Sequence, residues 1–232
     1  MNSIVRVIIT FALILSGFLM HQINDEKEIF TVIFISIFTY NILYKWVLKR
    51  AKLNPNLHLL YSFSYLISFI LIIYINNISI QMGTQESPFL PGDSLGYFNL
   101  ARQLSENKIA LLDMPLNYIG YPLVLSWVFK LFGAHLIYGL LLNMLLLFIN
   151  IFLISELTFK ITKNSKDFQN SFIIILLTSS FIAPGFMLLK DSSIITAVTL
   201  SLYSSLNLTI SSSHNKYLTY SSTCNYPKKI GF

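Results

Sequence analysis

Two aspartates lie where an otherwise apolar chain turns polar, and they are the first candidates for chemistry. Asp93 lies in the longest polar stretch, and Asp191 lies between two apolar runs nearer the C-terminus. A carboxylate fixed at a membrane surface can act as a general base on an acceptor hydroxyl. Each aspartate can also cap the helix that follows it by accepting backbone N–H bonds. The two roles are compatible, because a capping carboxylate is also a fixed one.

Basic residues close to these acids could bind phosphate. Lys190 directly precedes Asp191, and Arg102 lies further along the stretch that contains Asp93. Arg and Lys bind phosphate by charge-assisted hydrogen bonds, although a solvated helix surface is the commoner role of a residue such as Arg102. One carboxylate is a poor metal site, but two brought together would suit a hard cation such as Mg²⁺ or Mn²⁺. The sequence has no HExxH motif, and we assign no residue as a metal ligand.

The composition places these residues in a membrane protein. Apolar residues make up 54% of the 232 residues and charged ones 11%, against about a quarter charged in soluble domains. The net charge of +6 comes from Lys and Arg at the ends of apolar runs. That placement indicates membrane topology and not a nucleic-acid partner. The single Cys224 excludes an internal disulfide.

Six apolar runs approach the length of about 20 residues that a spanning helix needs. They are residues 3–20, 29–48, 57–80, 136–157, 172–189 and 192–210. A basic start before an apolar run is also typical of a secretory signal. Because no small-x-small cleavage site follows, we expect an uncleaved first helix. The sequence therefore predicts an all-α, polytopic membrane protein of about six transmembrane helices.

The charges of the links predict how the helices cross the membrane. The link around residues 49–52 and the link 158–170 are rich in lysine, and so is the tail. The positive-inside rule assigns all three to the cytoplasm, in a bacterial inner (plasma) membrane with the N-terminus inside. The long link 81–135 and the Lys190-Asp191 turn then both lie outside. Asp93 and Asp191 could therefore face one site on the outer surface.

The long outer link is expected to contain two short interfacial helices. The first begins at Asp93-Ser94, and one of its faces is apolar because of Tyr97, Leu100, Ala101 and Leu104. The second covers about residues 121–132. Both are too short to span, so we expect them to lie in the interface plane.

A resemblance to a known family rests on several short motifs in a fixed order. These are D-x3-Y-x3-A formed by Asp93, Tyr97 and Ala101, then Gly120-Tyr121-Pro122, then residues 140–143, then Pro184 followed by Leu189-Lys190-Asp191-Ser192. This order resembles the GT-C superfamily of membrane glycosyltransferases, of the protein mannosyltransferase and lipid A aminoarabinose transferase type. The resemblance covers roughly residues 89–202.

The resemblance implies transfer of a hexosyl or pentosyl group from a polyprenyl-phosphate-linked donor to an acceptor on the extracytoplasmic face. Asp93 matches the essential aspartate of the family's first outer loop, and Asp191 matches a second acid on the next one. Both would be catalytic, with a divalent cation such as Mg²⁺ or Mn²⁺ as the cofactor to consider. The substrate-binding residues would be Lys190, Arg102, Tyr97 and Tyr121.

The resemblance also divides the chain. Residues 1–56 form two extra N-terminal transmembrane helices, because the family loop usually follows the first span. Residues 57–210 form the GT-C-like core with its outer loop 81–135. Family members have ten or more spans, so we expect this chain to correspond to an N-terminal fragment. The Ser-rich polar tail 211–232 is expected to be aberrant.

Two other functions compete with the glycosyltransferase interpretation. A transporter or flippase for a lipid-linked saccharide would need ionisable residues deep in its spans, and the predicted spans contain almost none. An inactive, truncated membrane protein or a non-catalytic subunit would agree with the short chain and its unusual tail.

Overall fold

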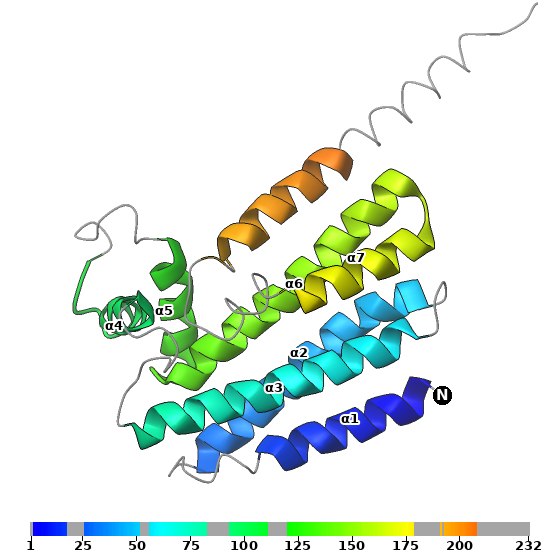
Figure 1. Cartoon of the computed structure of the whole chain (residues 1–232). Coiled ribbons are helices and arrows are strands. Elements are labelled where there is room, and N and C mark those ends of the chain that lie inside the picture. Colours follow the sequence, from blue (N-terminus) through cyan, green and yellow to red (C-terminus); the bar gives the residue numbers. More distant parts are fainter. Residues whose placement is uncertain are drawn as a thin grey trace, which may run out of the picture.

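The structure is a computed structural model that describes residues 2–17, 26–51, 56–82, 93–110, 120–178, 191 and 193–207, and the regular structure in these ranges is all helical. Seven helices have the following bounds: α1 Asn2–Gly17, α2 Glu26–Ala51, α3 Leu57–Gln81, α4 Asp93–Ser105, α5 Gly120–Phe132, α6 Leu136–Thr162 and α7 Ser165–Leu177. Residues 193–207 form a further helix, drawn in orange in Figure 1. The predicted all-α class is confirmed for the described residues.

Three helices are long and apolar enough to cross a membrane, by length and composition. They are Lys27–Val47 within α2, Leu57–Gln81 in α3 and Leu136–Thr162 in α6, at about 20 residues or more. These agree with three of the six predicted spans and indicate a membrane protein. α1 has 16 residues and α7 has 13, which is shorter than a span. The remainder of the predicted runs 3–20 and 172–189, and the end of the run 192–210, lie outside the described residues.

α7 begins earlier than predicted because a local cap starts it. The side-chain oxygen of Asn164 accepts a hydrogen bond from the Lys166 backbone N–H at 3.1 Å, which satisfies one of the free donors at a helix N-terminus. Asp167 adds a negative charge in the first turn, where the helix dipole favours it. The helix therefore starts at Ser165 and not near Phe172.

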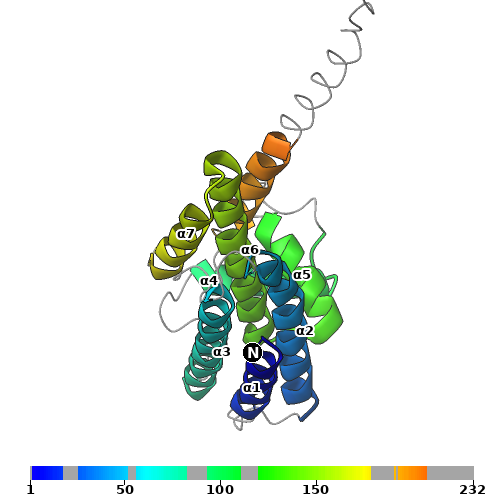
Figure 2. The same ribbon diagram turned by 90° about the vertical axis from the view of Figure 1, so that its right-hand side faces the viewer.

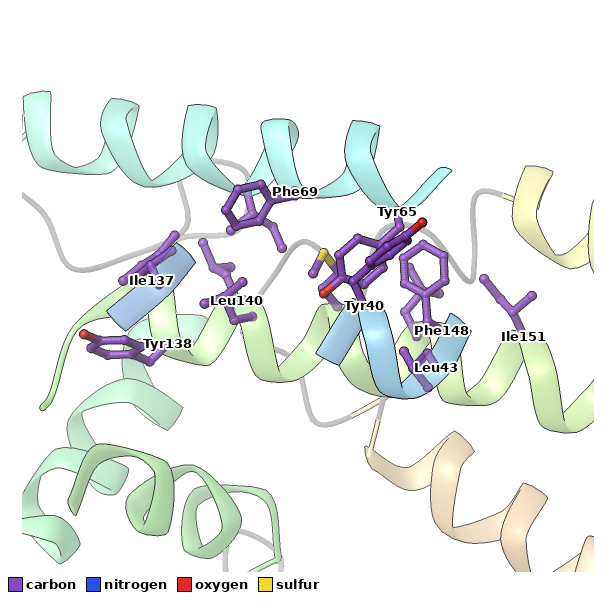
Figure 3. Packing of buried hydrophobic residues seen from close by; sticks show 14 of the residues in the cluster. Tyr40, Leu43, Tyr65, Phe69, Ile137, Tyr138, Leu140, Phe148 and Ile151 are labelled. Atoms are coloured by element: carbon purple, nitrogen blue, oxygen red, sulfur yellow. The ribbon is translucent and has the colours of Figure 1, made fainter. Parts of the chain in front are cut away.

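The helices α1, α2, α3 and α6 pack side by side, with α4 and α5 at one end (Figures 1 and 2). Aromatic rings fill the centre where α2, α3 and α6 meet (Figure 3). The Tyr65 ring lies 5.3 Å from Tyr40 and 5.2 Å from Phe148, measured between ring centroids. The Tyr40 hydroxyl is 2.9 Å from Ser62 Oγ, and Tyr65 donates to the Ser36 carbonyl at 3.0 Å. Buried tyrosines are stable there because their hydroxyls have partners.

α4 and α5 pack against each other through aromatic pairs. The rings of Phe98 and Phe129 lie 5.2 Å apart. The buried face of α4 is formed by Tyr97, Phe98, Ala101 and Leu104. This confirms most of the predicted apolar face. Leu100 is half-buried instead of buried, because α5 covers the side of α4 that carries Phe98.

One close polar contact shows which links share an end of the bundle. Glu28, in the first turn of α2, lies 2.5 Å from Nε2 of His135, the residue before α6. The links before α2 and before α6 are therefore at the same end, as are α4 and α5 (Figure 1). The turn between α6 and α7 is at the other end, where Lys163 has a φ of 57° and its backbone N–H bonds to the Phe159 carbonyl.

Candidate functional site

Asp93 begins α4, as the sequence predicts. Its side chain lies outside the described residues. Tyr97 follows it by one helical turn, so the contacts of Tyr97 determine where this end of α4 is held. A negative charge at a helix N-terminus is favoured by the helix dipole.

Tyr97 and Tyr121 lie together and connect three helices. The Tyr121 ring packs edge-on against Tyr97 with centroids 5.6 Å apart. The Tyr121 hydroxyl donates a 2.9 Å hydrogen bond to Oδ1 of Asn143 on α6. All three residues are buried, and burial raises the pKa of the Tyr121 hydroxyl well above its ordinary value, so it stays a neutral donor. This contact holds α4 and α5 on α6.

Asn143 is a site residue for which the sequence motifs predicted no role. The signal was present, because Asn143 is a strongly polar side chain inside a long apolar run. A buried amide without partners in an apolar interior is costly. A polar residue in such a run therefore predicts a specific hydrogen-bond partner, although the sequence does not indicate which one.

Replacement of Tyr121 by Phe is expected to lower the free energy of unfolding by about 1–2 kcal/mol, because the buried Asn143 carbonyl loses a donor while the ring packing is kept. Denaturant titration in detergent micelles measures this change. Tyr74 is a matched control, since it is an exposed tyrosine on α3, and Tyr74→Phe should change stability by less than about 0.5 kcal/mol. Equal stabilities of the two variants would contradict the assigned role of the Tyr121 hydroxyl.

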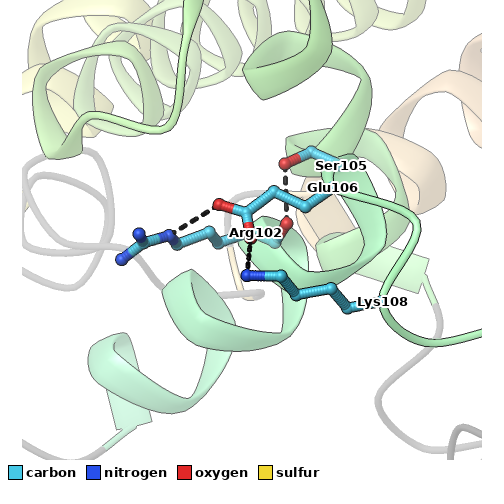
Figure 4. Close-up of polar contacts among 4 residues, drawn as sticks. All are labelled: Arg102, Ser105, Glu106 and Lys108. Atoms are coloured by element: carbon cyan, nitrogen blue, oxygen red, sulfur yellow. Dashed lines mark hydrogen bonds and ion pairs between the residues drawn. The ribbon is translucent and has the colours of Figure 1, made fainter.

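Arg102 lies on the exposed side of α4 (Figure 4). Its Nε is 2.9 Å from Oε1 of Glu106, and Nζ of Lys108 is 2.5 Å from Oε2 of the same carboxylate. The ion pair uses one of the five N–H donors of the guanidinium. Arg102 therefore lies on a solvated helix surface, which was the commoner of the two roles considered for it. Its remaining N–H donors are still available to a phosphate.

The pKa of Glu106 reports on its contacts with Arg102 and Lys108. Hydrogen bonds from Lys108 and then Arg102 lower the pKa of the Glu106 carboxyl. A depressed folded-state pKa stabilises the fold above the unfolded-state pKa, and that contribution is lost as the pH falls through the folded-state pKa. Lys108→Gln is expected to raise the pKa of Glu106 toward its ordinary value in a carboxyl ¹³C NMR titration. Lys166→Gln, at the other end of the bundle, should leave it unchanged; an equal shift in both variants would contradict this assignment.

Asp191 is an exposed residue at the start of the helix 193–207, and Lys190 lies outside the described residues. The far end of this helix contacts α6, where Lys160 hydrogen-bonds to Asn207 and its Nζ lies 4.0 Å from the centre of the Tyr203 ring. In Figures 1 and 2 the helix runs alongside α6 and begins beside α5 and α6.

The rise of the helices relates Asp191 to the tyrosine contact. From Asn207 back to Asp191 the helix covers about 24 Å, at about 1.5 Å per residue. The same distance along α6 from Lys160 reaches the level of about Met144, next to Asn143. The start of the helix 193–207 therefore lies toward the end of the bundle where α5 packs on α6. Asp93 is one turn from Tyr97, which packs on Tyr121.

The described residues do not form a metal centre. No three His, Cys, Asp or Glu side chains come together in the ranges that the structure covers. The candidate metal ligands that the sequence suggested are the carboxylates of Asp93 and Asp191, which lie on separate segments.

No protein-family model, no curated protein and no solved structure matches this chain. The fold itself defines the class: an all-helical protein with three helices long and apolar enough to span a membrane, carrying two short helices at one end of the bundle. The site on these short helices is the basis of the function proposed below.

Proposed function

We propose that the chain is a membrane glycosyltransferase that transfers a sugar from a polyprenyl-phosphate-linked donor to an acceptor on the extracytoplasmic face. The observation that supports it is the contact of Tyr97, Tyr121 and Asn143, which holds the Asp93 end of α4 on the bundle. A catalytic carboxylate must be held in a fixed place by rigid elements. The helix 193–207 begins beside α5 and α6, which supports a position of Asp191 at the same end of the bundle.

In the proposed reaction Asp93 accepts the proton of the acceptor hydroxyl, or positions that hydroxyl for attack. The hydroxyl oxygen forms a bond to the anomeric carbon of the sugar. The bond between that carbon and the phosphate oxygen breaks, and polyprenyl phosphate leaves with the electron pair. Lys190 or Arg102 stabilises the charge of the departing phosphate, and such electrostatic stabilisation is usually the largest contribution to catalysis. Asp191 orients Lys190.

The proposed orientation has the N-terminus in the cytoplasm of a bacterial inner membrane. The lysine-rich links support this orientation through the positive-inside rule. The contact between Glu28 and His135 fits this topology in one respect, because it places on one side the two links that the topology assigns to the same side.

A transfer assay tests the proposed function. The purified protein is reconstituted into liposomes with polyprenyl-phosphate sugars labelled in the sugar, together with a membrane-protein, lipid or polysaccharide acceptor fraction. We expect label in the acceptor and an equal amount of free polyprenyl phosphate. Release of polyprenyl phosphate without labelled acceptor, or no turnover of hexosyl and pentosyl donors, would contradict the proposal.

The accessibility of single cysteines tests the placement of the two acids. In a Cys224→Ser background, we expect Asp93→Cys and Asp191→Cys both to react with a membrane-impermeant thiol reagent on intact cells. Lys163→Cys is the matched control, because Lys163 is exposed at the other end of the bundle; it should react after permeabilisation alone. Protection of either aspartate position on intact cells would rule out a shared outer site.

A further inference from the structure

A groove with one charged end lies between α1 and α2, which pack against each other. Its volume is about 500 Å³, within the range of about 300–1,000 Å³ typical of small-molecule sites. It is lined by Arg6, Val7, Thr10, Phe11, Ile14 and Asn41. One of these residues is a cation, and three have purely apolar side chains.

The charged end is held in place by a hydrogen bond between the two helices. Nε of Arg6 donates to Oδ1 of Asn41 at 2.5 Å, and Nδ2 of Asn41 donates to the Ile37 carbonyl at 2.7 Å. Asn41 is thus oriented with its oxygen toward the guanidinium. Among the residues that the structure describes, no carboxylate forms an ion pair with Arg6. A cation in a membrane-associated helix requires an anion or water, and the remaining N–H donors of Arg6 can bind one.

The rest of the groove is apolar and runs along α1 away from Arg6. Val7 and Phe11 are 68% and 61% exposed, and Ile14 continues the same face, since residues i, i+4 and i+7 lie above one another on a helix. From Arg6 to Ile14 this surface extends about 12 Å. A site with a cation at one end and an apolar wall of this length fits an anionic amphiphile better than a small polar ion.

The charged end of the groove lies where the head group of a lipid in the same leaflet would lie. Asn41 lies one turn before Lys45, and Lys49 and Arg50 follow at the same end of α2. Such a basic end is attracted to anionic lipid head groups. A lipid whose phosphate contacts Arg6 would have its acyl chain along Phe11 and Ile14, toward the middle of the apolar span.

We propose that the groove between α1 and α2 binds an anionic phospholipid, with its phosphate on Arg6 and an acyl chain along Val7, Phe11 and Ile14. Asn41 positions the guanidinium. The site is at the end of the bundle opposite to α4 and α5, so it does not depend on the proposed transferase activity.

Native mass spectrometry of the full chain in detergent micelles tests this site. The delipidated protein is titrated with phosphatidylglycerol or phosphatidylcholine of identical acyl chains. We expect phosphatidylglycerol to bind about tenfold more tightly. Both lipids carry the phosphodiester, but the choline cation of phosphatidylcholine repels the Arg6 guanidinium and offsets the charge of the phosphate. Arg6→Gln should abolish this preference and Arg6→Lys should retain most of it. Lys130→Gln is the control, because Lys130 is an exposed lysine on α5 bonded to Asn107.

A second variant tests the apolar part of the groove separately from the charge of Arg6. Ile14→Trp leaves Arg6 in place and fills the apolar part, so it should weaken the binding of both lipids several-fold while the preference persists. Inorganic phosphate at the same concentration as the lipid should not displace phosphatidylglycerol. The proposal is overturned if Arg6→Gln retains the preference, if Ile14→Trp binds like the parent protein, or if inorganic phosphate competes equally. Circular dichroism of each variant verifies that the helices are intact.

Discussion

Replacement of Asp93 by Asn is expected to lower the rate of sugar transfer by a factor of about 10² to 10⁴, the range in which positioned general bases contribute. Asn keeps the size of the side chain, but it cannot accept the proton of the acceptor hydroxyl. The loss should appear in kcat, because the charge change acts on the transition state more than on donor binding. The assay is the transfer of labelled sugar in proteoliposomes.

Asp167→Asn is the matched control for this experiment. Asp167 lies in the first turn of α7, which has 13 residues like α4. Both variants lose a negative charge at a helix N-terminus, which is worth about 0.3–1 kcal/mol of stability. If that were the whole effect, the two variants would have the same activity. Equal rates in both variants would exclude Asp93 as the general base.

Replacement of Phe148 by Ala is expected to lower the free energy of unfolding by about 3 kcal/mol, within the range for buried aromatic truncations. Phe148 is 2% exposed, and its ring centroid is 5.5 Å from Tyr61 and 5.2 Å from Tyr65. Association of helices in a membrane depends on close packing more than on removal from water. Removal of the ring would therefore leave a cavity and remove packing contacts between α3 and α6.

Unfolding by titration with sodium dodecyl sulfate measures the effect of this variant. Phe63→Ala is the matched control, because Phe63 is 59% exposed on the outer side of α3 and should change stability by less than about 1 kcal/mol. A double variant with Tyr65→Leu should lose less than the sum of the two single losses, since the rings of Phe148 and Tyr65 pack on each other. Equal losses for Phe148→Ala and Phe63→Ala would contradict the central role of the aromatic cluster.

The sequence by itself determined that the protein is an all-helical membrane protein, and it determined where the long apolar helices lie in the chain. Runs of apolar residues about 20 long form helices in a membrane, because every backbone N–H and C=O must be bonded within the segment. α2, α3 and α6 were predictable for that reason. The start of α4 at Asp93 and most of its buried face were also predictable, because a helix start and a 3.6-residue period are local properties of the chain. The catalytic roles of the two aspartates stay predictions, and so do the substrate-binding roles of Lys190, Arg102, Tyr97 and Tyr121.

The tertiary structure decided which of these residues meet. The hydrogen bond of Tyr121 to Asn143 joins residues on different helices, and so does the bond of Arg6 to Asn41. Periodicity indicates which face of a helix is apolar, but any apolar face can pack on any other. The partners are selected by the fit of side chains and by the need of each buried polar group for a hydrogen bond. Both conditions depend on residues far apart in the chain, so they are met in the folded bundle and cannot be read from one segment.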